Sequence, residues 1–154
     1  MSVEIRVSET EDVSVESAFA YIDDYTNHPK FLHGSLPLVP ITDITRGLGA
    51  TFKGGMGLGP VTLKSTVKVV DWQENKLISV DSIAGFDVDF LYEFAEVAPN
   101  KARVDLLVTY RLPGGFAGQI MGRTIEPFVK IAVKFSTHSL KKQIIEFHKA
   151  RTNA

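Results

Sequence analysis

The sequence predicts an α+β fold: a seven-stranded antiparallel sheet that curves around one long C-terminal helix, with two short helices after the first strand. Apolar residues alternate with polar ones in segments 86–97 and 103–112, as in strands that bury one face. The connections between successive strands after Leu36 are short, and short connections require antiparallel neighbours. Residues 120–148 then change to helical spacing and stay apolar for longer than a small core requires.

The N-terminal elements follow from local signals. Residues Val3–Val7 alternate and predict the first strand. Ser14 can accept hydrogen bonds from the free amides of a first helical turn, so a helix is predicted to begin there. Pro29 should end this helix, because its ring disfavours helical geometry at the preceding residue. A second short helical turn is expected from Phe31 to Gly34.

The remaining six strands are read from alternation and from turn residues. Gly54 and Gly55 weaken the third strand and predict a bulge or a sharp bend. Asn75 and Asn100 lie in short hairpin connections. The strands are predicted at 36–43, 50–56, 61–69, 77–83, 86–97 and 103–112.

The C-terminal helix is expected to begin between Gly118 and Pro127 and to end near His148. Lys130 and Lys134 form a polar line, and the opposite face is predicted to point toward the sheet. That inward face consists of Met121, Ile125, Phe128, Ala132, Phe135, Leu140, Ile144 and Phe147.

Composition limits the function. The 154 residues are expected to form a single domain over 1–154, and a net charge of −1 with scattered Lys and Arg gives no nucleic-acid footprint. The chain contains no cysteine, which excludes disulfides, thiolate metal sites and a Cys nucleophile. The sequence begins without an apolar signal segment and contains no apolar stretch that could span a bilayer, so we expect a cytoplasmic protein.

The polar residues give no catalytic or metal motif. His28, His33, His138 and His148 are not spaced to converge on a metal, so we expect no metal and no cofactor, and surface positions for all four. If one histidine is functional, His33 is the candidate. The glycines of segment 54–59 precede a strand rather than a helix, which argues against a dinucleotide loop. Asp87 and Asp89 are predicted on the solvent face of their strand.

An internal ligand cavity is the main functional prediction. Tyr92 and Tyr110 fall on inward strand positions, where a buried phenol needs a hydrogen-bond partner from a ligand or from the protein itself. Ser65 is a third inward polar group with the same ambiguity. The predicted cavity residues are Phe90, Tyr92, Phe94, Val108, Tyr110, Ser65, Phe128, Ala132, Met121 and His33. The entrance is expected where the Pro113–Gly118 loop meets the His28–Gly34 segment.

Three passages of the chain have a recognisable pattern. Asp24, Pro29 and Phe31 form a D-x-x-x-x-P-x-[FW] passage. Gly47, Gly49 and Ala50 form a G-x-G-[AT] turn, and segment 108–112 is a V-T-Y-R-L strand. In these passages the chain resembles the SRPBCC superfamily, the START-like or helix-grip fold, and more closely its polyketide cyclase/dehydrase and lipid-transport branch. The resemblance implies a hydrophobic cavity that holds lipids, polyketides, quinones or hormones. It implies no shared catalytic residues.

Three functions remain open from the sequence. The leading hypothesis is a carrier or sensor of a hydrophobic small molecule. The alternative is a cyclase, aromatase or dehydratase that acts on a polyketide-like substrate through Tyr92, Tyr110, His33 or Ser65. The third is a protein whose exposed helix face or 113–120 loop contacts another subunit or a second copy.

Overall fold

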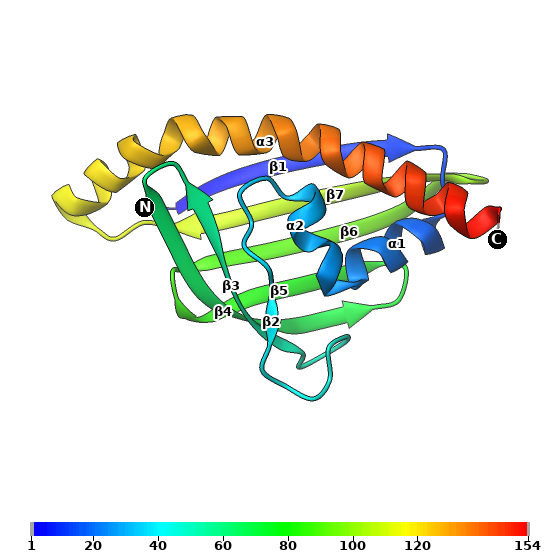
Figure 1. Cartoon of the computed structure of the whole chain (residues 1–154), viewed down its shortest axis with the longest axis horizontal. Coiled ribbons are helices and arrows are strands. Elements are labelled where there is room, and N and C mark those ends of the chain that lie inside the picture. The colour runs from blue at the N-terminus through cyan, green and yellow to red at the C-terminus, as the bar shows by residue number, and fades with distance from the viewer. Residues whose placement is uncertain (1, 154) are drawn as a thin grey trace.

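The structure is a computed structural model, and it describes residues 2–153 (Figure 1). Within these residues one long helix, α3, arches over the concave face of a sheet, and two short α-helices, joined by a 3-10 turn, lie at one end of that face. The helices are α1 (Val15–Asp23), the 3-10 helix η1 (Tyr25–Asn27), α2 (His28–Phe31) and α3 (Gly115–Thr152). The strands are β1 (Ser2–Glu11), β2 (Val39–Pro40), β3 (Thr51–Leu58), β4 (Val61–Gln73), β5 (Leu77–Gly85), β6 (Val88–Ala98) and β7 (Lys101–Arg111).

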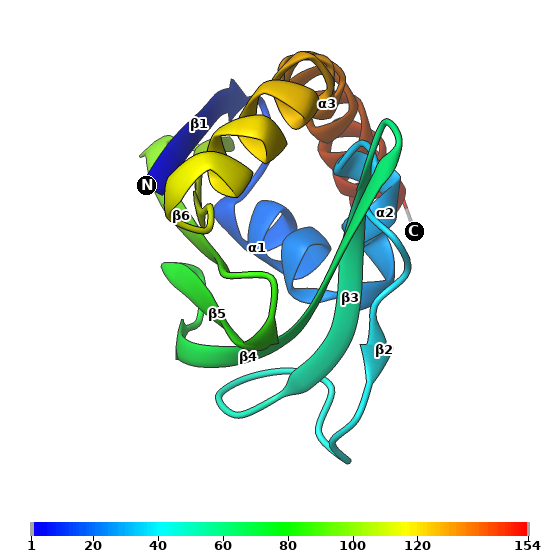
Figure 2. The ribbon, with the colours of Figure 1, turned by 90° about the vertical axis from the view of Figure 1, so that its left-hand side faces the viewer.

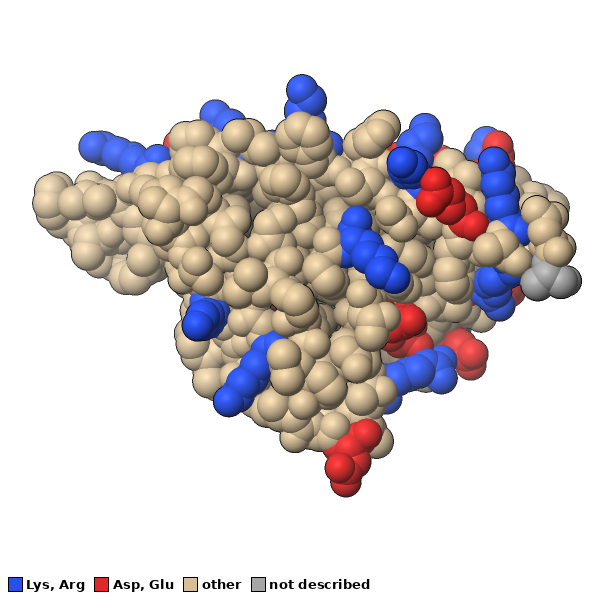
Figure 3. Space-filling view, in the orientation of Figure 1, with Lys and Arg blue, Asp and Glu red and all other residues tan. Residues whose placement is uncertain are grey.

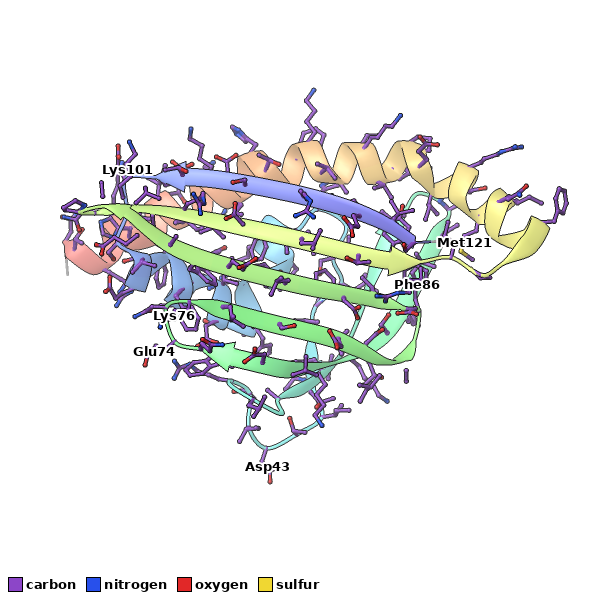
Figure 4. The ribbon with its side chains drawn as sticks, turned by 180° about the vertical axis from the view of Figure 1, so that it is seen from behind. Asp43, Glu74, Lys76, Phe86, Lys101 and Met121 are labelled. Atoms are coloured by element: carbon purple, nitrogen blue, oxygen red, sulfur yellow. The ribbon has the colours of Figure 1, made fainter. Side chains whose placement is uncertain are left out.

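The sheet confirms the predicted antiparallel architecture. Within residues 2–153 it has seven strands in the order β1-β7-β6-β5-β4-β3-β2, and every neighbouring pair is antiparallel. Two register shifts between β4 and β5 bend it, because an unpaired residue increases local twist. Figure 2 shows the resulting curl around the interior. Figure 4 shows the outer face, with Lys76 and Lys101 in hairpins at one end and Phe86 at the other.

Helix α1 covers one end of the concave face. Ser14 caps it by accepting a hydrogen bond from the Ser17 amide at 3.1 Å. Its buried Phe19 contacts Phe94 of β6 edge to face, with ring centroids 5.1 Å apart. It makes a similar contact with Trp72 of β4 at 5.5 Å. This aromatic packing fills the sheet end beneath α1.

Helix α3 is longer than predicted at both ends. It begins at Gly115, directly after an extended Gly114, and continues to Thr152. Pro127 lies inside the helix without ending it. The side chains buried most deeply on α3 include Ile125, Leu140 and Ile144, so the predicted packing of the helix on the sheet holds along most of its length.

The predicted strand 36–43 is reduced to the two residues of β2. Val39 pairs with Lys53, and Pro40 pairs with Phe52. Pro40 has no N–H to donate, which restricts it to an edge position and limits the ladder there. The following segment, 41–50, is a loop with exposed Ile41 and Ile44.

Gly59, in the turn between β3 and β4, provides a test of how α3 packs on the sheet. It has φ +62°, and an added Cβ would lie 2.2 Å from the Phe128 ring of α3. We expect Gly59→Ala to lower the free energy of unfolding by about 2–4 kcal/mol, from left-handed strain and overpacking together.

Gly47→Ala is the matched control for this prediction. Gly47 also has positive φ, at +87°, but open space surrounds it, so only backbone strain of about 1 kcal/mol is expected. Urea unfolding measures both variants. Equal losses in the two would mean that Phe128 does not pack on Gly59.

Candidate functional site: the cavity between sheet and helix

An internal cavity lies between the concave face of the sheet, the α1–α2 segment and α3. It offers about 170 Å³ to the centres of water-sized molecules, and its wall is almost entirely apolar. This is room for many water molecules, whereas an apolar wall gives water few hydrogen-bond partners. The space therefore suits an apolar guest.

Six of the predicted residues line this cavity. β6 and β7 contribute side chains from adjacent inward positions, since Phe90 pairs with Val108 and Val88 with Tyr110. Ala132 comes from α3, together with Val129 and Ser136, which were not predicted. The six are Ser65, Phe90, Tyr92, Val108, Tyr110 and Ala132.

The other four predicted residues lie outside the cavity wall within the described chain. Phe94 faces inward, but α1 covers it. Met121 packs against the core beyond the cavity end, and Phe128 lies over Gly59. His33 is exposed, and its ring lies 5.3 Å from that of Phe135.

His28 is the functional candidate that the sequence prediction missed. It was expected at the surface, yet it lines the cavity and joins a three-residue network. Its Nε2 lies 3.0 Å from the Tyr92 hydroxyl, and its Nδ1 lies 3.1 Å from Ser35 Oγ. Pro29 places His28 at the start of α2, facing β6, and the Phe90 ring packs on it at 5.8 Å.

Burial keeps this network neutral. It lowers the pKa of His28 from 6.5 to about 4 and raises the pKa of Tyr92 above its usual 10. At neutral pH the imidazole is therefore uncharged and the phenol is protonated. The network can orient a ligand by hydrogen bonds but presents no charge to it.

Two further polar groups face the cavity at another end. The Ser65 hydroxyl donates to the Phe86 carbonyl at 2.6 Å. The Tyr110 hydroxyl has no hydrogen-bond partner among residues 2–153. Burial, with a smaller contribution from Glu126, raises the pKa of Tyr110, so this phenol is also protonated at neutral pH. Tyr110 is thus available to a ligand.

The cavity wall reaches the surface at loop 41–50, through exposed Thr45 and Arg46. Arg46 pairs with Asp23 at the end of α1 and lies over the Trp72 ring, 5.3 Å from its centroid. Trp72 Nε1 also donates to Asp23 at 2.8 Å. The expected entrance is therefore wrong in part: His28 lines the cavity, but no residue of 113–118, all described, does so.

Charge on the protein is dispersed. Figure 3 shows Lys and Arg scattered singly over the face that carries α3. Asp87 and Asp89, predicted on the outer face, pair with Arg111 at 2.7 and 2.9 Å. In the described part of the chain, no helix has the length and apolar character to cross a membrane, and no three His, Asp or Glu side chains cluster as metal ligands would.

Comparison with known proteins identifies the fold. Neither the protein-family models nor the curated proteins that were searched contain a match. Among solved structures, TTHA0849 from Thermus thermophilus has a TM-score of 0.76 at 14% identity, covering 94% of this chain and 98% of that one. The Zhui aromatase/cyclase from a Streptomyces species has a TM-score of 0.75 at 6% identity, covering 94% of each chain. A START superfamily protein from Mycobacterium smegmatis has a TM-score of 0.72 at 9% identity, covering 93% and 97%.

These likenesses extend over nearly the whole chain and confirm the predicted class, an α+β helix-grip architecture. The chain has a START-like, helix-grip fold. Identities of this size establish the fold only, so function is argued from the cavity.

Proposed function

We propose that this protein binds a hydrophobic small molecule in the cavity between sheet and α3, as a carrier or sensor. The observation that carries the proposal is an almost wholly apolar internal space in which the polar pair His28 and Tyr92 is neutral and already hydrogen-bonded to each other. Such a site favours apolar surface with one or two oriented polar atoms. The START-like fold of the chain is consistent with it.

Apolar burial supplies enough free energy for this role. Each buried CH₂ group contributes about 0.8 kcal/mol, so about ten of them contribute about 8 kcal/mol. That corresponds to a Kd of about 1 μM before the cost of ordering the ligand. No charged anchor is needed.

Titration with 1-anilinonaphthalene-8-sulfonate, a dye that fluoresces in apolar surroundings, tests the proposal. We expect a saturable 1:1 signal that 1-decanol displaces competitively. A signal that fails to saturate, or that decanol leaves unchanged, would place the dye on exposed apolar side chains and overturn the proposal.

The alternative is an enzyme of the polyketide cyclase, aromatase or dehydratase type acting in the same cavity. The fold shared with the Zhui aromatase/cyclase is compatible with it. However, the His28 pKa of about 4 is far from neutral, and acid–base catalysis works best when the pKa lies near the working pH. The cavity therefore supports binding better than proton transfer.

Tyr110→Phe separates the two functions. For a carrier, loss of one hydrogen bond should weaken ligand affinity about fivefold at most, because such a bond is worth about 1 kcal/mol. For an enzyme that uses this phenol, binding should persist and turnover should fall about a hundredfold or more. Dye displacement measures the ligand affinity, and an assay with an aromatic polyketide substrate measures the turnover.

A further inference from the structure

The hydrogen-bond directions around His28 determine what the cavity offers to a ligand. Ser35 Oγ lies 3.1 Å from both His28 Nδ1 and the Leu36 carbonyl oxygen, and the carbonyl can only accept. Ser35 has one proton. Both contacts are hydrogen bonds only if Ser35 donates to Leu36 and accepts from an Nδ1–H of His28. If Ser35 instead donated to His28 Nδ1, its oxygen and the Leu36 carbonyl oxygen would face each other without a proton between them.

This arrangement determines the state of Tyr92. A neutral imidazole carries a single N–H, so with Nδ1 protonated its Nε2 has only a lone pair. The contact of 3.0 Å between Nε2 and Tyr92 is then a bond that the phenol donates. A directed chain runs from the Tyr92 hydroxyl through His28 and Ser35 to the Leu36 carbonyl. The Tyr92 oxygen keeps only acceptor capacity for the cavity.

The Ser65 hydroxyl oxygen, like that of Tyr92, can only accept a hydrogen bond from a ligand. Its one proton is donated to the Phe86 carbonyl at 2.6 Å, so its oxygen also faces the cavity as an acceptor. Tyr110, without a partner among residues 2–153, can donate or accept. It pairs with Val88, four residues from Tyr92 along β6, which is about 13 Å of strand. The polar groups are thus separated along an apolar floor.

We propose that the cavity selects an elongated apolar molecule that carries a hydrogen-bond donor, a hydroxyl or N–H group, at the end that meets Tyr92. This inference rests on the proposed function and specifies its ligand class. Tyr92 is the specificity-determining residue, because its oxygen accepts from the ligand. His28 and Ser35 are positioning residues that act by holding the Tyr92 proton. A ligand with only an acceptor at this end leaves two oxygens facing each other without a hydrogen bond.

Two isomers provide the test: 1-decanol, which can donate, and methyl nonyl ether, which can only accept. Both are titrated by displacement of 1-anilinonaphthalene-8-sulfonate, and the readout is the ratio of their Kd values. We expect the double variant His28→Leu/Tyr92→Phe to reduce the preference for the alcohol about fivefold relative to the unmodified protein, because Tyr92→Phe alone would leave the His28 Nε2 lone pair as an acceptor in the same place. His28→Leu releases the Tyr92 proton, so it should shift the ratio toward the ether.

Tyr21→Phe is the matched control. It removes the same atom from a buried tyrosine outside the cavity wall, and the alcohol preference should be retained. An unchanged ratio in the double variant His28→Leu/Tyr92→Phe, with both isomers bound, would overturn this inference and leave the proposed function intact. If neither isomer displaces the dye from the unmodified protein, the proposed function is overturned and the inference with it.

Discussion

Ala132→Trp is expected to abolish uptake of an apolar molecule into the cavity. Ala132 is buried on α3 and lines the cavity, where a space of about 170 Å³ can receive an indole ring. The new side chain would occupy the volume that a ligand needs. We expect the affinity for 1-anilinonaphthalene-8-sulfonate to fall at least a hundredfold, because the apolar area available for burial is lost.

The matched control is Ala150→Trp, the same substitution at an exposed position near the end of the same helix. It adds an equal apolar surface outside the cavity and should leave dye affinity unchanged. Circular dichroism and thermal unfolding establish that both variants are folded. A folded Ala132→Trp variant that binds the dye with unchanged affinity would contradict the assignment of this cavity as the binding site.

Acid should destabilise the protein through His28 by about 2.5 kcal/mol between pH 7.5 and 4.5. The unfolded chain binds a proton at His28 below about pH 6.5, whereas the folded protein does so only below about 4. Protons therefore favour the unfolded state across that window. The stability that neutral His28 contributes is fully present above pH 6.5 and is lost as the pH falls toward 4.

The variant His28→Leu isolates this effect. It lacks the titrating group. Between pH 7.5 and 4.5 its free energy of unfolding should therefore fall by about 2.5 kcal/mol less than that of the unmodified protein. Urea unfolding of both proteins at the two pH values gives the difference, in which the contributions of other groups cancel. An equal pH dependence in the two proteins would show that the His28 imidazole is protonated in the folded state as readily as in the unfolded chain, and would contradict the lowered pKa.

The strand register could be predicted from sequence because it follows from alternation. Phe90 and Tyr92 lie two residues apart on β6 and both line the cavity. Phe94 continues the same pattern, but whether an inward residue meets a cavity or a helix depends on packing by distant segments. Phe19 of α1 covers the Phe94 ring, and nothing in the local sequence of β6 indicates this contact.

The rotation of α3 was harder to predict because the N-terminal half of the helix is apolar almost all round. The predicted inward face included Phe128 and Phe135, which are 36% and 50% exposed. The observed face is rotated toward Val129 and Ser136, which line the cavity. A polar serine on the inward face and exposed phenylalanines outside contradict the rule used to assign the faces.

The His28 network could not be predicted from sequence for a different reason. Its bond to Tyr92 joins residues 64 positions apart, and its partner Ser35 lies in the segment after α2, where an isolated bridge joins it to Met56 of β3. A partly buried histidine needs partners for its ring nitrogens, and these are recognisable only when the fold brings them together. The D-x-x-x-x-P-x-[FW] passage leaves the position before Pro29 unspecified, so the motif contains no signal for His28.

Intermolecular nuclear Overhauser effects between bound 1-decanol and methyl-labelled protein test the central claim most directly. Val129 and Ala132 line the cavity, whereas Ile120 and Ile131 of the same helix are exposed. The cavity site predicts contacts from the decanol chain to the methyl groups of Val108, Val129 and Ala132. Contacts confined to Ile120 and Ile131 would show that apolar molecules bind the outer face of α3 and would contradict an internal ligand site.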